Sequence, residues 1–175
     1  MGSENRIAAR LKIVDEHVML ENEHDLDGVM KTFGAGARYD DEPWDAHYAG
    51  HGEVRAFYGE LMRALPDLHL DVRRRHAGED AVILEVIMRG RHLGAWRGLP
   101  ATGRRLEFPL CAVFTFDETD RLLGEKIYYD RATVLKQLGL FHEPDRLIGR
   151  VTTVLAHPVT MAQVVRRAIS GRTGP

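Results

Sequence analysis

Apolar side chains in the first third of the chain recur at steps of three and four residues, the spacing of one face of an α-helix. From Asn5 to His24 this stripe contains Ile7, Leu11, Val14, Val18 and Leu20. A shorter helix follows the capping residue Asp25 and stops at Gly34. A third helix is predicted from Gly52 to Leu65, because Pro66 disfavours helical backbone in the residue before it.

Beyond Pro66 the apolar spacing changes to the alternation of β-strands, with turn residues between the runs. The predicted strands are Ala37 to Glu42, Leu68 to His76, Ala81 to His92, Arg104 to Phe116 and Leu122 to Asp130. Helices followed by an antiparallel meander indicate the α+β class. We predict a cone-shaped α+β barrel, in which a curved antiparallel sheet wraps around three N-terminal helices and leaves a pocket.

Only every second residue of a strand can face this pocket, because successive side chains point to opposite faces of a sheet. In the strand ending at His92, Met88 and His92 share a face. In the last strand, Tyr128 and Asp130 lie on the face opposite Tyr129. The pattern leaves open which face points inward, and a bulge would exchange the two faces beyond it.

The chain divides where the strand pattern ends. We predict a cone-shaped domain over residues 5–140 and a C-terminal helical extension over residues 141–175. Asp145 would cap one helix of the extension, and Pro158 or Thr160 would begin a second.

The extension is rich in apolar residues, which predicts that its helices are buried against their own chain or a dimer partner. The alternative is an amphipathic arm on a membrane surface. Its polar face would be formed by Arg146, Arg150, Arg166, Arg167 and Arg172.

Composition narrows the partners. The 175 residues carry a formal net charge of -2, which argues against nucleic acid, because such binding needs a concentrated basic surface. No run approaches the roughly 18 apolar residues of a membrane span, and the N-terminus has no apolar signal segment. Cys111 is the single cysteine, so no intramolecular disulfide can form, and we expect a cytoplasmic protein.

The sequence contains no phosphate-binding loop and no dinucleotide fingerprint, so no cofactor is expected. His47 and His51 have a metal-ligand spacing, but a four-residue step aligns two ligands reliably only on a helix. The segment after Pro43 is predicted as a loop, and we expect surface or pocket-rim histidines and no metal site. What remains is acid/base chemistry in an apolar pocket, where burial can raise the pKa of a carboxyl group.

Two motifs resemble those of the SnoaL-like polyketide (ester) cyclases, in the nuclear-transport-factor-two-like superfamily. The signature G-x-H-x-G-x-[FW]-x-G-[LI]-P-x-T-G-[RK] is present from Gly90 to Arg104, and D-x-x-x-[LV]-L-x-Q-L-G from Asp130 to Gly139. The resemblance covers roughly residues 10 to 140. It implies a homodimer joined through the outer sheet face.

The same resemblance implies a cofactor-independent acid/base enzyme. It would be polyketide cyclase-like, or an isomerase or hydratase, and would act on an apolar carbonyl-containing small molecule. The alternative is a non-catalytic small-molecule-binding or interaction module, because one fold serves many functions.

Three residues receive catalytic roles from the resemblance. Asp130 matches an aspartate near a strand end that moves protons in these cyclases; its alternative role is the N-cap of the next helix. His92 would donate to a developing enolate oxygen at the pocket rim, or else stabilise a turn. Asp41 lies on the strand that carries the general base in ketosteroid isomerases, distant relatives by fold. Alternation puts it on the face of Tyr39, and a solvated acidic turn is its alternative.

The ligand would be apolar or aromatic, because the chain offers several rings that suit a flat molecule. The candidate ligand-binding residues are Trp44, Phe57, Met88, Trp96, Tyr128 and Tyr129. For most of them the alternative is a place in the hydrophobic core.

Overall fold

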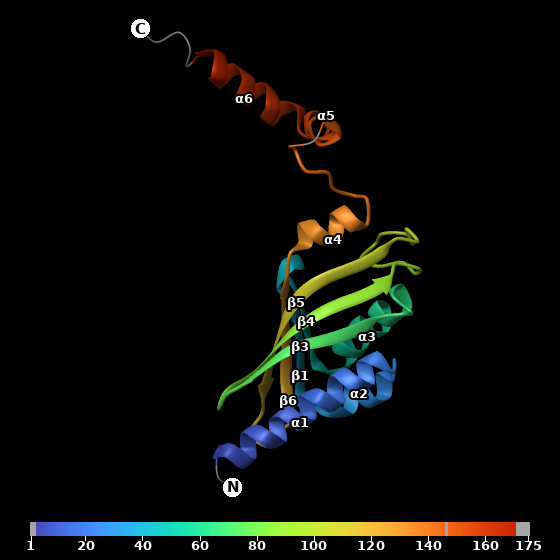
Figure 1. Ribbon diagram of the computed structural model, residues 1–175, viewed down its shortest axis with the longest axis vertical. Helices are drawn as coiled ribbons and strands as arrows, with labels where there is room; N and C mark the ends of the chain where they lie inside the picture. Colours follow the sequence, from blue (N-terminus) through green and yellow to red (C-terminus); the bar gives the residue numbers. More distant parts are fainter. Residues whose placement is uncertain (1–2, 146, 171–175) are drawn as a thin grey trace. The chain divides into compact units, whose positions relative to one another are not determined.

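The computed structural model describes residues 3–145 and 147–170. The chain forms two compact units, the first ending at Leu138 and the second beginning at Gly139. The helices of the first unit are α1 (Ser3–Asn22), α2 (Leu26–Thr32), the short 3-10 helix η1 (Glu42–Trp44), α3 (Gly50–Ala64) and α4 (Arg131–Gln137). The three predicted N-terminal helices are thus present (Figure 1), each with bounds within two residues of those expected.

Six strands form one mixed sheet in the order β2-β1-β6-β5-β4-β3. They are β1 (Phe33–Asp41), β2 (Ala46–Ala49), β3 (His69–Ala77), β4 (Ala81–Arg91), β5 (Arg105–Phe116) and β6 (Leu122–Tyr129). Strands β3 to β6 form the antiparallel meander that the alternation predicted. β1 instead runs parallel to β6, with Tyr39 beside Glu125, so the prediction of a wholly antiparallel sheet is wrong at this pairing. Alternation along a strand carries no information about its direction relative to a distant partner.

The segment Ala46–Ala49, predicted as a loop, is the strand β2 and pairs antiparallel with the end of β1. Asp45, with a φ of 50°, turns the chain into it. Four residues are too few for an alternating pattern to stand out. As a result His47 lies at the edge of the sheet, opposite Asp40.

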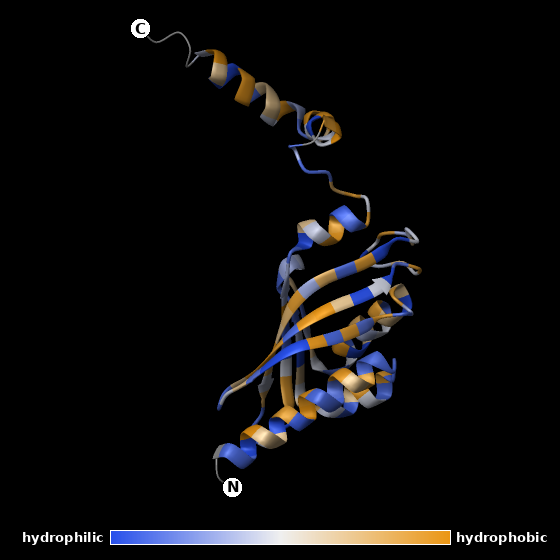
Figure 2. Cartoon of the chain, in the orientation of Figure 1, coloured by the Kyte–Doolittle hydropathy of each residue, from blue (hydrophilic) through white to orange (hydrophobic). Residues whose placement is uncertain are grey.

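Helices α1, α2 and α3 cover one face of the strongly twisted sheet (Figure 1). That face supplies the core, and along β4 the residues Val82, Leu84 and Val86 are buried, whereas Glu85 is exposed. At the start of β5 the hydropathy colours also alternate between hydrophilic and hydrophobic (Figure 2). The face that carries Met88 therefore points inward.

The second unit contains α5 (Leu147–Ala156) and α6 (Pro158–Ser170), separated at His157 as expected. Both helices contain many hydrophobic residues (Figure 2). The exposed apolar side chains are those of Leu147, Ile148, Val151, Val154, Leu155, Val159, Val164, Val165 and Ile169. Burial of these side chains against their own chain or a dimer partner stays a prediction. Arg146 and Arg172 of the alternative membrane-surface arm lie outside the described residues. No helix in the described part of the chain is both long and apolar enough to cross a membrane.

Candidate active site

An apolar cavity lies between the inner face of the sheet and helices α1 and α3. Space for the centre of a water molecule amounts to about 40 Å³, which is room for a few waters. Among the residues that the structure describes, three carboxyl groups line it, those of Glu21, Asp41 and Glu125. Carboxyl groups in such a place are candidates for acid/base chemistry, because burial disfavours their charged form.

Asp41 ends β1 with its side chain in the cavity, and only 1% of the residue is exposed. Its Oδ2 accepts hydrogen bonds from Nη2 of Arg97 and from Oη of Tyr129, the latter at 3.3 Å. Its Oδ1 is buried and has no hydrogen-bond partner among the described residues. Burial raises the pKa of Asp41, although the charge of Arg97 and the hydrogen bond from Tyr129 oppose this effect. One carboxylate oxygen is therefore held in place, and the other is free to accept a proton.

A tight turn between β4 and β5 brings Arg97 to Asp41. Backbone hydrogen bonds in both directions join Trp96 to the residue three positions later, and Arg97 and Gly98 have φ values of 50° and 76°. Positive φ at both central residues is the geometry of a type I′ turn. This conformation costs energy for a residue with a Cβ, so the surroundings must hold it. One such support is Oε1 of Glu60, which accepts a 2.8 Å hydrogen bond from the backbone N–H of Arg97.

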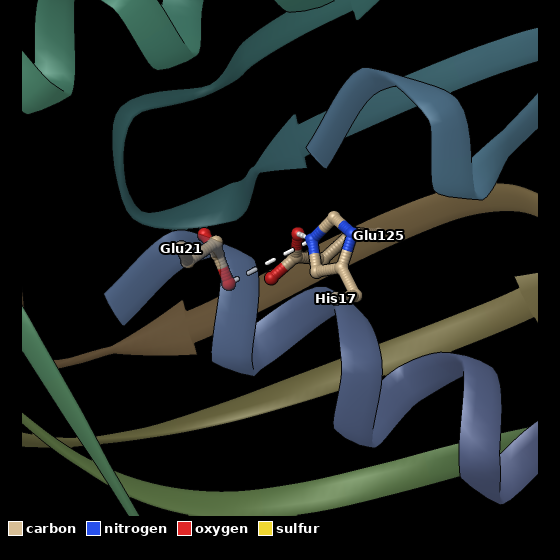
Figure 3. Close-up of side chains that lie close together, drawn as sticks. All are labelled: His17, Glu21 and Glu125. Carbon is tan, nitrogen blue, oxygen red and sulfur yellow. Dashed lines mark ion pairs between the residues drawn. The ribbon is translucent and has the colours of Figure 1, made fainter. Parts of the chain in front are cut away.

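A second polar group, the His17 cluster, consists of His17 and Glu21 on α1, Tyr58 on α3 and Glu125 on β6. All four residues are buried, and both carboxylates lie close to the imidazole (Figure 3). Oη of Tyr58 donates to Oε2 of Glu125. Nε2 of His17 lies 3.1 Å from that hydroxyl, 3.4 Å from Oε2 of Glu125 and 3.7 Å from Oε2 of Glu21. The cluster thus places two carboxyl groups and one imidazole at the edge of the cavity.

The two carboxyl groups of the His17 cluster do not share the same environment. Glu125 has the Tyr58 hydroxyl as a donor, whereas Oε2 of Glu21 has no hydrogen-bond partner among the described residues. Burial, and after it the charge of Glu125, raises the pKa of Glu21 well above its usual value. The ligand atoms of His17, Glu21 and Glu125 lie within 4.8 Å of one another, so this is the group in the described chain that could hold a metal ion.

The His17 cluster was not predicted from the sequence, although the chain contains a signal for it. His17 and Glu21 lie on the same helical stripe as Val14 and Val18, at steps of three and four residues. A polar residue on an apolar stripe needs a partner when the stripe is buried. Glu125 likewise shares the inward face of β6 with buried residues. Which of these polar residues meet depends on how α1 packs against the sheet.

Asp130 lies outside the lining of the cavity, so the acid/base role expected at this strand end stays a prediction without support from the cavity. The residue is exposed and caps α4, accepting hydrogen bonds from the backbone N–H groups of Ala132 at 2.9 Å and Thr133 at 3.2 Å. These bonds and a 2.6 Å bond from the Thr133 hydroxyl lower the pKa of Asp130. Because β6 turns Tyr129 inward, alternation leaves Asp130 pointing outward. The geometry gives it the capping role that was its alternative.

His92 is fully buried but is not part of the cavity lining. Its Nδ1 lies 3.1 Å from Oγ1 of Thr102 and accepts a 3.3 Å hydrogen bond from the backbone N–H of the same residue. Burial lowers the pKa of His92. The contacts join the two ends of the loop between β4 and β5, so they support the turn-stabilising alternative. A catalytic role for His92 has no support from a contact with the cavity.

Four of the six predicted ligand-binding residues line the cavity, namely Phe57, Met88, Trp96 and Tyr129. Trp44 is not in the lining; the guanidinium of Arg97 lies 4.9 Å from the centre of its ring, a cation–π distance. Tyr128 is 46% exposed on the outer face of the sheet, so the expectation that it binds the ligand is not supported. Its side chain points away from the cavity for the same reason as that of Asp130.

His47 and His51 are both exposed and bind separate partners. Nδ1 of His47 lies 2.7 Å from Oδ1 of Asp40, and Nε2 of His51 lies 2.7 Å from the backbone oxygen of Gly34. The expectation of surface histidines is confirmed, although His47 lies on a strand and His51 on a helix.

The family model for the SnoaL-like polyketide cyclase matches residues 11–138. Because this match covers most of the chain and the fold agrees with it, the chain belongs to the SnoaL-like polyketide cyclase family. The resemblance found in the two motifs is thereby confirmed. The homodimer that it implies stays a prediction.

Solved structures of low sequence identity share the fold. AclR, a putative hydroxylase from Streptomyces galilaeus, is 24% identical with a TM-score of 0.67, covering 78% of this chain and 99% of its own. A protein with a ketosteroid isomerase-like fold from Catenulispora acidiphila, in complex with trimethylamine, is 18% identical with a TM-score of 0.61. The match covers 73% of this chain and 92% of that protein. SalBIII, an epoxide hydrolase/cyclase-like enzyme with a role in pyran ring formation in the polyether salinomycin, is also 18% identical with a TM-score of 0.61. The match covers 70% of this chain and 91% of SalBIII. No curated protein matches the chain.

Proposed function

We propose that the protein is a cofactor-independent acid/base enzyme of this family, polyketide cyclase-like or an isomerase or hydratase, with Asp41 as the general base. Its substrate is a small, largely apolar molecule that contains a carbonyl group. The observation that supports this proposal most is the asymmetry of the Asp41 carboxylate: Arg97 and Tyr129 hold Oδ2, and Oδ1 is buried without a partner among the described residues.

The proposed step is removal of a proton from the carbon next to the carbonyl group. The C–H bond breaks, its electron pair moves into the carbon–oxygen system to form an enolate, and the proton goes to Oδ1 of Asp41. A raised pKa makes the carboxylate a stronger base, and the Arg97 cation keeps it ionised despite burial. The apolar lining suits the remainder of such a substrate. Return of the proton to another carbon, or attack of the enolate on a second carbonyl, completes an isomerisation or a cyclisation.

A proton-exchange assay tests this assignment without knowledge of the natural substrate. Cyclopentanone is small and apolar, and the exchange of its α-protons in D2O can be followed by NMR. Asp41→Asn keeps the size of the side chain but removes the base, so we expect exchange to slow by about 100-fold or more. Asp130→Asn is the matched control, since Asp130 is exposed on the α4 cap, and it should leave the rate unchanged.

The result also separates the enzyme from the alternative of a binding module. If the full chain binds cyclopentanone but accelerates exchange no more than the Asp41→Asn variant does, the acid/base proposal is wrong. Native mass spectrometry of a co-purified ligand would then identify what the cavity holds.

A further inference from the structure

We propose that the carboxyl group of Glu21 forms a binding subsite in the cavity, where it donates a hydrogen bond to an acceptor oxygen of the ligand. The proposal rests on the proposed function only in taking a carbonyl oxygen as that acceptor. It is supported by the hydrogen bonds and the burial of the His17 cluster, of which Figure 3 draws His17, Glu21 and Glu125.

One proton of the cluster lies on Nδ1 of His17. This atom lies 2.7 Å from Oγ1 of Thr32, and that hydroxyl donates its own proton to the backbone oxygen of Val29 at 2.7 Å. The hydroxyl oxygen can therefore only accept from the imidazole, so Nδ1 carries a proton. Nε2 is the ring nitrogen that faces the two carboxyl groups.

Glu125 is the member of the carboxyl pair that has donors. The Tyr58 hydroxyl donates to its Oε2, so the Tyr58 oxygen presents only acceptor capacity to Nε2 of His17, 3.1 Å away. A proton on Nε2 satisfies this contact and places an imidazolium 3.4 Å from Oε2 of Glu125. Glu125 is then an ionised carboxylate with a positive partner and a hydroxyl donor.

Glu21 has no comparable support. Only 4% of the residue is exposed, and Oε2 lies 3.7 Å from Nε2 of His17, too far for a hydrogen bond. A second ionised carboxylate beside Glu125 would be buried, unpaired and repelled. The same causes, burial and the Glu125 charge, raise the pKa of Glu21 well above its usual value. The neutral acid avoids this penalty, and its Oε2 has no hydrogen-bond partner among the described residues.

An acceptor oxygen of the ligand can reach Glu21 from the cavity, because Glu21 is part of the cavity lining together with Asp41. The parallel register puts Glu125 beside Tyr39, and Asp41 follows two residues later on β1. Two residues span about 6 to 7 Å along a strand. A small ketone could therefore place its oxygen at the His17 cluster and an acidic C–H near Asp41.

A matched pair of probes tests the donor. Cyclopentanone and methylenecyclopentane have the same shape, but only the ketone has an acceptor oxygen. Their dissociation constants are measured by NMR for the unsubstituted protein and for Glu21→Met, which keeps the length of the side chain and removes the donor. In Glu21→Met the dissociation constant of the ketone divided by that of methylenecyclopentane should rise by roughly fivefold to tenfold, which corresponds to the loss of one hydrogen bond. Comparing ratios cancels the different hydration of the two probes.

Two control variants make the result specific. Glu85→Met removes a carboxyl group from the outer sheet face, where Glu85 pairs with His76 at 3.0 Å, and should leave the ratio unchanged. Asp41→Asn should slow α-proton exchange by about 100-fold or more but keep the preference of the unsubstituted protein for the ketone. An unchanged exchange rate in Asp41→Asn would therefore remove the proposed function while the Glu21 subsite is still decided by the ratio.

An infrared spectrum supplies a second readout that needs no ligand. The difference between the full chain and Glu21→Gln at neutral pH should contain the C=O band of a protonated carboxylic acid. Absence of that band overturns the proposal, as does a probe ratio that is the same in the full chain and Glu21→Met, including the case in which neither probe binds. Stoichiometric binding of Mn²⁺ or Zn²⁺ that depends on His17 and Glu21 would overturn it too, because the ion would then take the place of the protons.

Discussion

The carboxyl group of Asp41, at the site it forms with Arg97 and Tyr129, lines the same cavity as the two carboxyl groups of the His17 cluster, yet the two sites stabilise buried carboxyl groups in different ways. At the Asp41 site a guanidinium cation is paired with one carboxylate, so the charges balance without any shared proton. In the His17 cluster one imidazole faces two carboxyl groups. A proton on the imidazole balances the charge of one carboxylate, so the second carboxyl group needs a proton of its own. Under the two proposals, the paired cation keeps Asp41 ionised as a base, whereas Glu21 lacks a cation of its own and is a neutral acid. Such a cavity would take a proton from a ligand and donate a hydrogen bond to it.

The largest effect is expected from removing the cation of the Asp41 site. Arg97→Met leaves a buried carboxylate without its partner, which should lower the free energy of unfolding by about 3 to 5 kcal/mol, measured by urea denaturation. Arg75→Met is the matched control, because Arg75 pairs with Asp15 at the surface and such pairs contribute about 1 kcal/mol or less. Equal losses of unfolding free energy in the two variants would show that the buried Arg97–Asp41 pair contributes no more than a surface pair.

Removing the imidazole of the His17 cluster should cost somewhat less, because Tyr58 still donates to Glu125. We expect His17→Leu to lower the free energy of unfolding by roughly 2 to 4 kcal/mol. His92→Leu is a matched comparison, since His92 is equally buried but faces no carboxylate among the described residues. A cost for His92→Leu as large as that for His17→Leu would contradict the charge balance assigned to the cluster.

The pH dependence of stability should distinguish the neutral acid from the carboxylates. Unfolded Glu21 ionises near pH 4.3, roughly the value for free glutamate, whereas burial raises its pKa in the folded state. Between these two pKa values the folded protein holds one proton more, so the free energy of unfolding falls as the pH rises.

Glu21→Gln removes that dependence, and its stability advantage over the unsubstituted protein should grow as the pH rises above the pKa of free glutamate, until the raised pKa of folded Glu21 is passed. The gain is about 1.4 kcal/mol for each unit by which folding raises the pKa. Urea denaturation at several pH values measures it. A difference that stays constant over this range would mean that Glu21 is ionised in the folded state. Glu85→Gln, at an exposed carboxylate on the outer sheet face, is the matched control.

The smallest effect is expected at Asp130, the carboxylate outside the cavity. Asp130→Ala removes the N-cap of α4 and should lower the free energy of unfolding by about 1 kcal/mol, with cyclopentanone exchange unchanged. Thermal or urea unfolding and the exchange assay are measured on the same variant. Lost exchange in a folded Asp130→Ala protein would return the acid/base role to Asp130 and break the contrast with Asp41.

Alternation along β1 and β6 is enough to sort the candidate residues into two faces. It places Tyr39 with Asp41, and Tyr128 with Asp130, and the fold keeps both pairs together. Alternation does not supply the direction in which each face points. That direction depends on which side of the sheet the helices cover, and hence on packing between distant segments.

Helix spacing, turn residues and the two motifs likewise determined the main elements, the α+β class and the family. These signals did not determine which residues contact one another within the site. Arg97 occupies a variable position of the first motif and reaches Asp41 only because a type I′ turn points it there. His17 and Glu125 are 108 residues apart in the sequence, and they meet because α1 packs against the sheet.

The sequence by itself therefore determined which residues could be buried, because burial follows the period of each element. Only the tertiary structure decided which buried charges face each other. Electrostatic pairing depends on distance in space, and the parallel pairing of β1 with β6 that aligns Tyr39 with Glu125 leaves no trace in the local pattern of either strand.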